Sequence, residues 1–498
     1  MQSVETVLAL IVLATVVAVS ARRFRVPAPS LLVVAGVAVG LLPFVPRVSI
    51  DPQVVALVVL PPLLYAAAED LSWRELRRVW RPVTILAFGL VLASAAAVGL
   101  VAAALTGLPA AMAFVLGAIL ASTDPVAVTA LGRRLPLPPR VSTLLQGESL
   151  FNDATSLVLF RVAVAGAAAG GALSWQRASG LFVLLAGGGA AVGALVAACV
   201  AAIRRRTEDP VLETVIALLT PYTAYVAAEA VHVSGITAVV VAGVILGGLA
   251  PGLTNPGIRL QLHAVYGTVV FLLESVVFAV IGLTLPGFVA DVATDPPRLL
   301  VEVLAVTATL LAVRVLWVFP LAAFGGGSLR GAAVVSWAGA RGVLPLAAAL
   351  SVPLDLPGRE LTVTITAAVI VLTLTVQGFT LSPLVRRSGI AASGADQRAE
   401  EIRADSATAR AALARLEELD SVPPEPAATL RRALRHRIDA RPEPAPEHTP
   451  LPAVRRELIA AELRELDRLY AEGEIGDATR RRLQRRLDLR DTALGEPE

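Results

Sequence analysis

The sequence predicts an all-α polytopic membrane protein. The chain has 498 residues, of which 56% are hydrophobic, and its mean hydropathy is +0.72. Apolar stretches of about 20 residues recur along it, and a helix of this length spans roughly 30 Å of hydrocarbon. The single cysteine, Cys199, has no second thiol to pair with. We therefore expect neither an internal disulfide nor a zinc–thiolate site.

Thirteen apolar segments are predicted to be transmembrane helices. Their ranges are 4–20, 29–45, 52–69, 82–105, 109–133, 140–170, 178–203, 211–231, 234–250, 263–286, 298–324, 329–352 and 360–385. One alternate set of loops then holds seventeen arginines, and the other holds only Arg47, Arg177, Arg298 and Arg359. Because arginine-rich loops stay in the cytoplasm, we expect the N-terminus outside and the C-terminus inside the cell membrane.

The composition changes beyond Val385. Residues 386–498 contain 21 of the 43 arginines and 22 of the 40 acidic residues. Residues 400–419 and 454–470 place apolar side chains at helical spacing among mixed charges, which is typical of amphipathic helices. We therefore divide the chain into a transmembrane domain, 1–385, and a cytoplasmic charged helical tail, 386–498. The tail has no phosphate-binding loop, and we expect it to be solvated and to have no nucleic-acid partner.

Carboxylates lie inside two of the predicted spans. Asp124 belongs to STDPV at 122–126, and Glu148 and Asp153 belong to GESLFNDATSLVLF at 147–160. An ionised side chain at the bilayer centre costs about 2.5 to 3.5 kcal/mol on insertion scales. Chains keep such residues mainly for function, so these segments are the first candidates for a site.

Helix breakers occur in the same part of the sequence. Pro125 removes a backbone donor and clashes with the preceding turn, so it predicts a broken helix at mid-depth. GARGVLP at 339–345 predicts a second interruption. Freed backbone groups inside a membrane are tolerated where they line a polar cavity, and we expect such a cavity at the break.

Oxygen-bearing side chains are predicted at similar depth on two helices. Ser149 and Asp153 are four residues apart and share a helix face, with Asn152 beside them. Thr123 and Asp124 lie at a comparable depth. Because hard cations prefer oxygen ligands, the pattern predicts a cation site built from Asp153, Asp124, Ser149 and Thr123, with Asn152 adjoining it.

The remaining intramembrane charges are expected to join helices. Glu148 and Arg341 fall at comparable depths, so we expect them to form a structural ion pair near the site. Glu274 could neutralise either Arg161 or Arg314. We expect these three to hold helices together rather than to bind substrate.

Together the motifs resemble those of the monovalent cation:proton antiporters, in the sodium/proton exchanger branch that includes NhaP-like proteins. STDPVAV, GESLFNDATSLVLF, GARGVLPLA and PPLLY follow the family's order within residues 1–385. The resemblance implies two inverted six-helix repeats around a linker helix, with the fifth and twelfth helices crossed and interrupted. It also implies a homodimer in the membrane lipid that exchanges monovalent cations for protons and needs no cofactor.

The resemblance also implies residue roles. Asp153 would be the principal carrier of cation and proton, and Thr123, Asp124 and Ser149 would complete the site. Asn152 stands where electrogenic relatives carry a second aspartate, which implies electroneutral exchange of one cation for one proton. Cation and proton would compete for Asp153, and an inward proton gradient would drive Na⁺ export in the service of pH homeostasis.

One position departs from the family pattern. Ala66 follows the PPLLY run at 61–65, where many family members carry an acid. This helix is therefore expected to contribute no carboxylate to the site. Glu69 and Asp70 are expected to lie too close to the inner surface to replace it.

Four other functions were weighed against Na⁺/H⁺ exchange. An antiporter that prefers K⁺ or Li⁺ stays open, since cavity size and backbone carbonyls decide ion preference. A uniporting channel and a membrane sensor that signals through the tail also stay open. An intramembrane hydrolase using Ser149 is disfavoured because the segment holds no histidine or lysine to act as a base, so we expect no enzyme activity.

Overall fold

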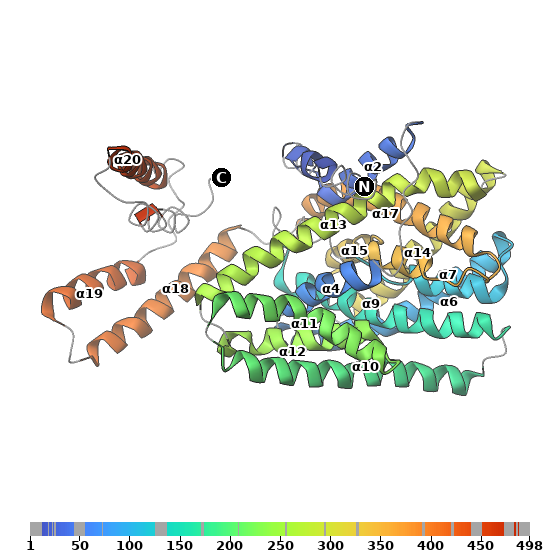
Figure 1. Ribbon diagram of the computed structural model, residues 1–498, viewed down its shortest axis with the longest axis horizontal. Coiled ribbons are helices and arrows are strands. Elements are labelled where there is room, and N and C mark those ends of the chain that lie inside the picture. The colour runs from blue at the N-terminus through green and yellow to red at the C-terminus, as the bar shows by residue number, and fades with distance from the viewer. Residues whose placement is uncertain are drawn as a thin grey trace. The chain divides into compact units, whose positions relative to one another are not determined.

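In the computed structural model, every regular element among the described residues is a helix or helical turn (Figure 1). The described residues are 12–17, 19–21, 23, 26–43, 55–71, 73–124, 137–170, 174–207, 209–253, 256–292, 295–324, 328–390, 394–419, 423–439, 451–472, 483, 484 and 487. No strand occurs among them. Pro125 lies outside these residues, so the break predicted there is followed only as far as Asp124.

Chain contacts divide the protein into two units, Met1–Ala392 and Ser393–Glu498. The first half of the first unit contains α2 (Ala28–Gly40), the π-helical turn η1 (Val55–Val59), α4 (Leu60–Glu69), α5 (Trp73–Thr84), the π-helical turn η2 (Ile85–Leu90), α6 (Val91–Leu105), α7 (Ala110–Leu120) and α9 (Pro139–Ala168). The second half contains α10 (Trp175–Arg204), α11 (Pro210–Ala230), α12 (Gly235–Leu253), α13 (Pro256–Val292), α14 (Pro296–Phe324), α15 (Leu329–Trp337), α16 (Val343–Leu350) and α17 (Arg359–Ser388).

All thirteen predicted spans overlap helical residues of the structure. Among the described residues, seven helices are long and apolar enough to cross a membrane, and five shorter apolar helices accompany them. The twelfth predicted span is split into α15 and α16. The fourth begins earlier than predicted, because the arginine-rich stretch before it joins one continuous helix, Trp73–Leu105. The number of spans stays a prediction.

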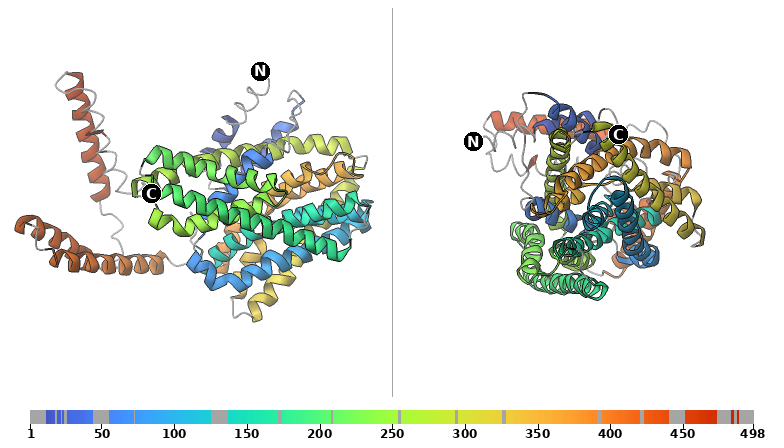
Figure 2. Two further views of the ribbon diagram at one scale, coloured as in Figure 1. Left: turned by 60° about the horizontal axis from the view of Figure 1, so that its bottom comes forward. Right: turned by 90° about the vertical axis from the view of Figure 1, so that its right-hand side faces the viewer.

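The helices of the first unit pack as one bundle (Figure 2), in which α10, α11 and α12 lie side by side (Figure 1). Small residues bring backbones together at the tightest crossings. A Cβ on Gly36 of α2 would lie 3.0 Å from the Cα of Gly282 on α13, and one on Gly117 of α7 would lie 3.0 Å from the carbonyl carbon of Ala95 on α6. Close backbone approach of this kind is a common basis of helix association in lipid.

The second unit contains α18 (Gly394–Glu417), α19 (Pro424–Asp439) and α20 (Leu451–Ala471). The helices α18 and α19 pack against each other, and an ion pair joins Asp405 to Arg437. Helix α19 was not among the amphipathic segments predicted for the tail, and it contains prolines. They lie at its N-terminal end, where proline's missing N–H leaves no intrahelical hydrogen bond unmade.

Candidate functional site

The site is built where two interrupted helices meet. Helix α7 ends at Leu120, and the chain continues through Ser122–Asp124 without helical structure. Helix α15 ends at Trp337, and α16 begins only at Val343. The backbone N–H of Asp124 donates to the carbonyl of Ala340 at 2.8 Å. The two breaks therefore satisfy each other's freed backbone groups, as the predicted crossing requires.

Gly342 is what permits the crossing to be this close. A Cβ at this position would lie 2.5 Å from the Cβ of Asp124 and would overlap its carboxylate. Its φ of −119° lies outside the left-handed region, and the constraint that the structure shows at this position is the overlap with Asp124. The second glycine of the GARGVLP motif, Gly342, thus leaves the space that the Asp124 side chain occupies.

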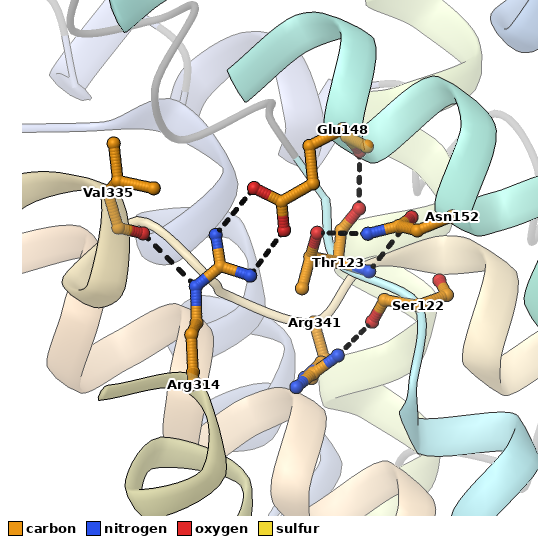
Figure 3. A network of polar contacts seen from close by, with 8 residues as sticks. Ser122, Thr123, Glu148, Asn152, Arg314, Val335 and Arg341 are labelled. Carbon is orange, nitrogen blue, oxygen red and sulfur yellow. Dashed lines mark hydrogen bonds and ion pairs between the residues drawn. The ribbon is translucent and has the colours of Figure 1, made fainter. Parts of the chain in front are cut away.

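Helix α9 supplies polar side chains to the end of α7 (Figure 3). Ser149 donates to the carbonyl of Thr123. Asn152 donates from its amide nitrogen to the Thr123 hydroxyl at 2.6 Å, and its amide oxygen accepts from the Thr123 N–H at 3.4 Å. One turn further along α9, Ser156 donates to the carbonyl of Ala118 at 2.7 Å. These contacts replace the hydrogen bonds that the broken helix loses.

A cavity of about 150 Å³ opens beside this crossing. Asp124 and Asp153 line it together with the hydroxyl-bearing Ser122 and Ser149. Leucine side chains of α4 and Glu274 of α13 also line it. Since one water occupies about 30 Å³ of liquid, the space accommodates a monovalent cation with part of its hydration shell.

The five predicted site residues therefore fall into two groups. Asp153, Asp124 and Ser149 lie on the cavity wall. Thr123 and Asn152 are buried and hydrogen-bonded to each other. Neither is among the residues that line the cavity. They hold the end of α7 in place, and the Thr123 carbonyl already accepts a hydrogen bond from Ser149.

Ser122 was not among the site residues predicted from the sequence. It lines the cavity together with Asp153, and its carbonyl accepts from the guanidinium of Arg341 (Figure 3). The available signal was its position, since it is a hydroxyl residue directly before Thr123 and Asp124 in an apolar segment. Its contact to the α15–α16 break could not be read from spacing along one helix.

The predicted pairing of Glu148 with Arg341 is wrong. Both carboxylate oxygens of Glu148 accept from Arg314 of α14, one of them at 3.0 Å from Nη2 (Figure 3). Arg314 also donates from Nε to the carbonyl of Val335 at 3.1 Å. With side chains 1% and 2% exposed, the pair fastens α9 to α14 and to the end of α15.

Arg341 has a different role because it lies in the extended segment between α15 and α16. Its guanidinium donates to the carbonyl of Ser122, and its backbone N–H donates to the Thr373 hydroxyl at 3.2 Å. The side chain therefore reaches a carbonyl freed at the end of α7 instead of a carboxylate on α9. This places a buried positive charge beside the two aspartates of the cavity.

Glu274 neutralises neither of the arginines considered for it. Arg314 pairs with Glu148, and Arg161 of α9 pairs with Glu229 of α11. Arg161 also donates to the carbonyl of Val233 at 3.4 Å. Glu274 lies on the cavity wall instead.

Position 66 of α4 is an alanine, so it offers no carboxylate, and it is not among the residues that line the cavity. Asp70 does line it, so the cavity reaches further toward the end of α4 than expected. Tyr65, next to Ala66, is buried and stacks on Tyr266 with ring centroids 5.8 Å apart.

Comparisons with known proteins agree with this architecture. The family model for the transmembrane sodium/hydrogen exchangers matches residues 8–387. The chain is 37% identical over 401 residues to a protein described as an uncharacterized Na⁺/H⁺ exchanger of Mycobacterium tuberculosis, with 76% of this chain and 73% of that protein covered. It is 31% identical over 422 residues to an Na⁺/H⁺ antiporter of Aphanothece halophytica, with 83% and 79% covered.

Among solved structures, the fold matches the sodium proton antiporter MjNhaP1 of Methanocaldococcus jannaschii. The TM-score is 0.63 at 21% identity, with 78% of this chain and 98% of that chain covered. The relatives are exchangers and antiporters, so the chain is a transporter rather than an enzyme, and its apolar helices make it an integral multi-pass membrane protein. On its family match and its relatives, the chain belongs to the sodium/hydrogen exchanger family.

Proposed function

We propose that this protein exchanges Na⁺ for H⁺ across the cell membrane, one for one, by competition of the two ions for Asp153. The observation that carries the proposal is the cavity at the crossing of the interrupted helices. Asp153, Asp124 and Ser149, with their carboxylate and hydroxyl groups, line it together. Oxygen ligands of this kind suit a hard monovalent cation and also accept a proton.

In this proposal Asp153 holds either a proton or a cation. Asp124 and Ser149 supply further oxygens, and Thr123 and Asn152 complete the site by fixing the end of α7 through their 2.6 Å hydrogen bond. Arg341 offsets part of the negative charge, since it lies against Ser122 on the same crossing. Binding of Na⁺ then expels the proton from Asp153, and binding of a proton expels Na⁺. The movements of the two ions are therefore coupled.

The exchange is proposed to be electroneutral because Asp153 alone releases a proton in each cycle. Asn152 stands beside it on α9 and cannot ionise, and its amide is engaged with Thr123 at 2.6 Å and 3.4 Å. Arg341, whose guanidinium donates to the Ser122 carbonyl on the same crossing, is proposed to balance negative charge at the site throughout the cycle. One cation therefore replaces one proton with no net charge movement.

Alternating access is proposed to come from motion of one bundle against the rest. The moving set would contain α7, α9, α15 and α16, which carry the site residues. The cavity is lined by residues of this set and by residues of α4 and α13, which lie outside it. The Arg161–Glu229 pair joins α9 to α11 and would have to break when the bundle moves. We further propose a homodimer with the N-terminus outside and the C-terminus in the cytoplasm.

The ion preference is tested with proteoliposomes that hold an acid-inside gradient and a pH-sensitive dye. Na⁺, Li⁺ and K⁺ are added in turn, because a relative from Bacillus subtilis, 32% identical, is described as a sodium, potassium, lithium and rubidium/H⁺ antiporter. Collapse of the gradient by Na⁺ supports the proposal, and the ranking of ions gives the preference. Cation entry without proton exit would instead indicate a channel, and no response to any ion would favour the sensor.

A further inference from the structure

We infer that one face of α5 is a binding site for the headgroups of anionic phospholipids. Arg74, Arg77, Arg78 and Arg81 follow one another at helical spacing of three, one and three residues, so they form one stripe along the helix. All four side chains are exposed. Within the part of the chain that the structure describes, none of them is paired with an acid, and the recorded partner of Arg81 is the ring of Trp80 at 5.6 Å.

The aromatic residues beside this stripe place it at the membrane surface. Trp73 and Trp80 lie two turns apart, and they are 54% and 55% exposed. Tryptophan is enriched where hydrocarbon meets headgroups. The helix then continues without interruption into an apolar stretch that ends at Leu105, where Ile85 and Phe88 are exposed. The arginines therefore lie about one to three helical turns before the hydrocarbon begins, which is the level of the phosphate groups.

The opposite face of α5 is packed against α9. Leu76 and Val83 are buried, and a Cβ on Gly147 of α9 would lie 3.2 Å and 3.3 Å from their side chains. Glu75 accepts a hydrogen bond from Thr143 of α9 at 2.7 Å. Helix α5, which carries the basic stripe, is therefore packed directly against α9, the helix that carries Ser149 and Asp153.

Phospholipid headgroups match this stripe better than a protein partner does. Arginine binds phosphate through two parallel N–H donors, and four such donors in a row face a surface rather than a single pocket. The proposed orientation places α5 at the cytoplasmic leaflet, whose anionic lipids attract clustered arginines. Exposed tryptophans next to the stripe add apolar anchoring that an acidic peptide would not use.

The binding is tested by native mass spectrometry of the full-length protein titrated with phosphatidylglycerol or phosphatidylcholine. One variant carries R74Q, R77Q, R78Q and R81Q. A control carries R205Q, R206Q, R386Q and R387Q, which remove the same charge from exposed positions on the same proposed side. Accessibility labelling checks that both variants insert in the native orientation.

We expect the native chain to retain phosphatidylglycerol in preference to phosphatidylcholine. An arginine at the lipid surface contributes about 1 kcal/mol, or about fivefold in affinity, so the α5 variant, which removes the whole stripe, should lose at least about tenfold. The control removes two separate pairs of arginines that form no continuous stripe, so its affinity should stay within about twofold. Equal loss in both variants, no loss in the α5 variant, or displacement of the lipid by inorganic phosphate at equal concentration would overturn the inference.

A second measurement asks whether lipid binding reaches the site on α9, and it rests on the proposed function. Exchange is followed in phosphatidylcholine vesicles that contain increasing phosphatidylglycerol. The native rate should rise with the anionic lipid, and the α5 variant should keep only the rate seen in phosphatidylcholine. A rate independent of lipid, together with intact lipid binding, would refute the coupling. If no exchange occurs in any vesicle, the proposed function fails and the binding measurement still decides the lipid site.

Discussion

Replacing Gly342 with alanine tests whether the crossing of the two breaks sets the geometry of the site. The added methyl would lie 2.5 Å from the Cβ of Asp124 and overlap its carboxylate, whereas ordinary carbon contacts begin near 3.5 Å. The φ of −119° at Gly342 lies outside the left-handed region. The overlap must therefore be relieved by moving the Asp124 side chain about 1 Å or more.

The expected effect is large on transport and moderate on stability. A displacement of about 1 Å at a reacting group can cost about a hundredfold in rate, and we expect a loss of this order in Na⁺-dependent proton efflux. The unfolding free energy should fall by about 1 to 3 kcal/mol, the usual cost of overpacking. Initial exchange rates in proteoliposomes and thermal unfolding of the purified protein give the two quantities.

Gly331→Ala is the matched control, because a Cβ there meets only the Ser328 side chain, at 3.8 Å. Gly331 lies near the N-terminal end of α15, the helix that ends at the same interruption. We expect this variant to exchange at the native rate. If Gly342→Ala exchanges as fast as Gly331→Ala, Asp124 does not need its observed position and the account of the crossing is refuted.

Three further outcomes follow from the ion pairs. Glu148→Ala should lower the unfolding free energy by about 3 to 5 kcal/mol, because it strands the buried arginine that it neutralises, and chemical unfolding in detergent measures this. Cysteines at Arg161 and Glu229, joined by a short thiol-reactive linker, should stop exchange until the linker is reduced; undiminished exchange would contradict motion between α9 and α11. In the tail, the Arg437 guanidinium holds the pKa of Asp405 below its usual range. That contact should therefore stabilise the α18–α19 pair above about pH 4 and be lost as the pH falls through the lowered value, which carboxyl NMR shifts of the native chain and of the glutamine variant of Arg437 would show.

The helices are predictable from the sequence because their signals are local. Apolar runs of spanning length indicate the helices, and the glycines and proline of 339–345 indicate the second break, whatever the rest of the chain packs against them. The placement of Ser149 and Asp153 on one face follows from the helical repeat alone. The structure brings both to the cavity with Asp124.

The partners of the buried charges are less predictable, because depth along a helix does not say which way a side chain points. Arg314 and Arg341 both meet the depth requirement for Glu148. In the structure Glu148 pairs with Arg314. Arg341 lies in the non-helical segment between α15 and α16, and its guanidinium donates to the carbonyl of Ser122 instead. The reach of the cavity to Asp70 likewise depends on how α4 packs against the crossing.

The central claim is that a cation displaces a proton from Asp153. It is tested most directly by counting the protons released as Na⁺ binds to the purified protein in weakly buffered solution, over a series of pH values. Asp153→Asn is the test variant, and Asp355→Asn, at an exposed position, is its control. The account predicts that the native chain and the control release one proton for each Na⁺ at low pH, that the release declines as the site ionises, and that Asp153→Asn releases none. Binding of Na⁺ without proton release at every pH, or unchanged release from Asp153→Asn, would contradict it.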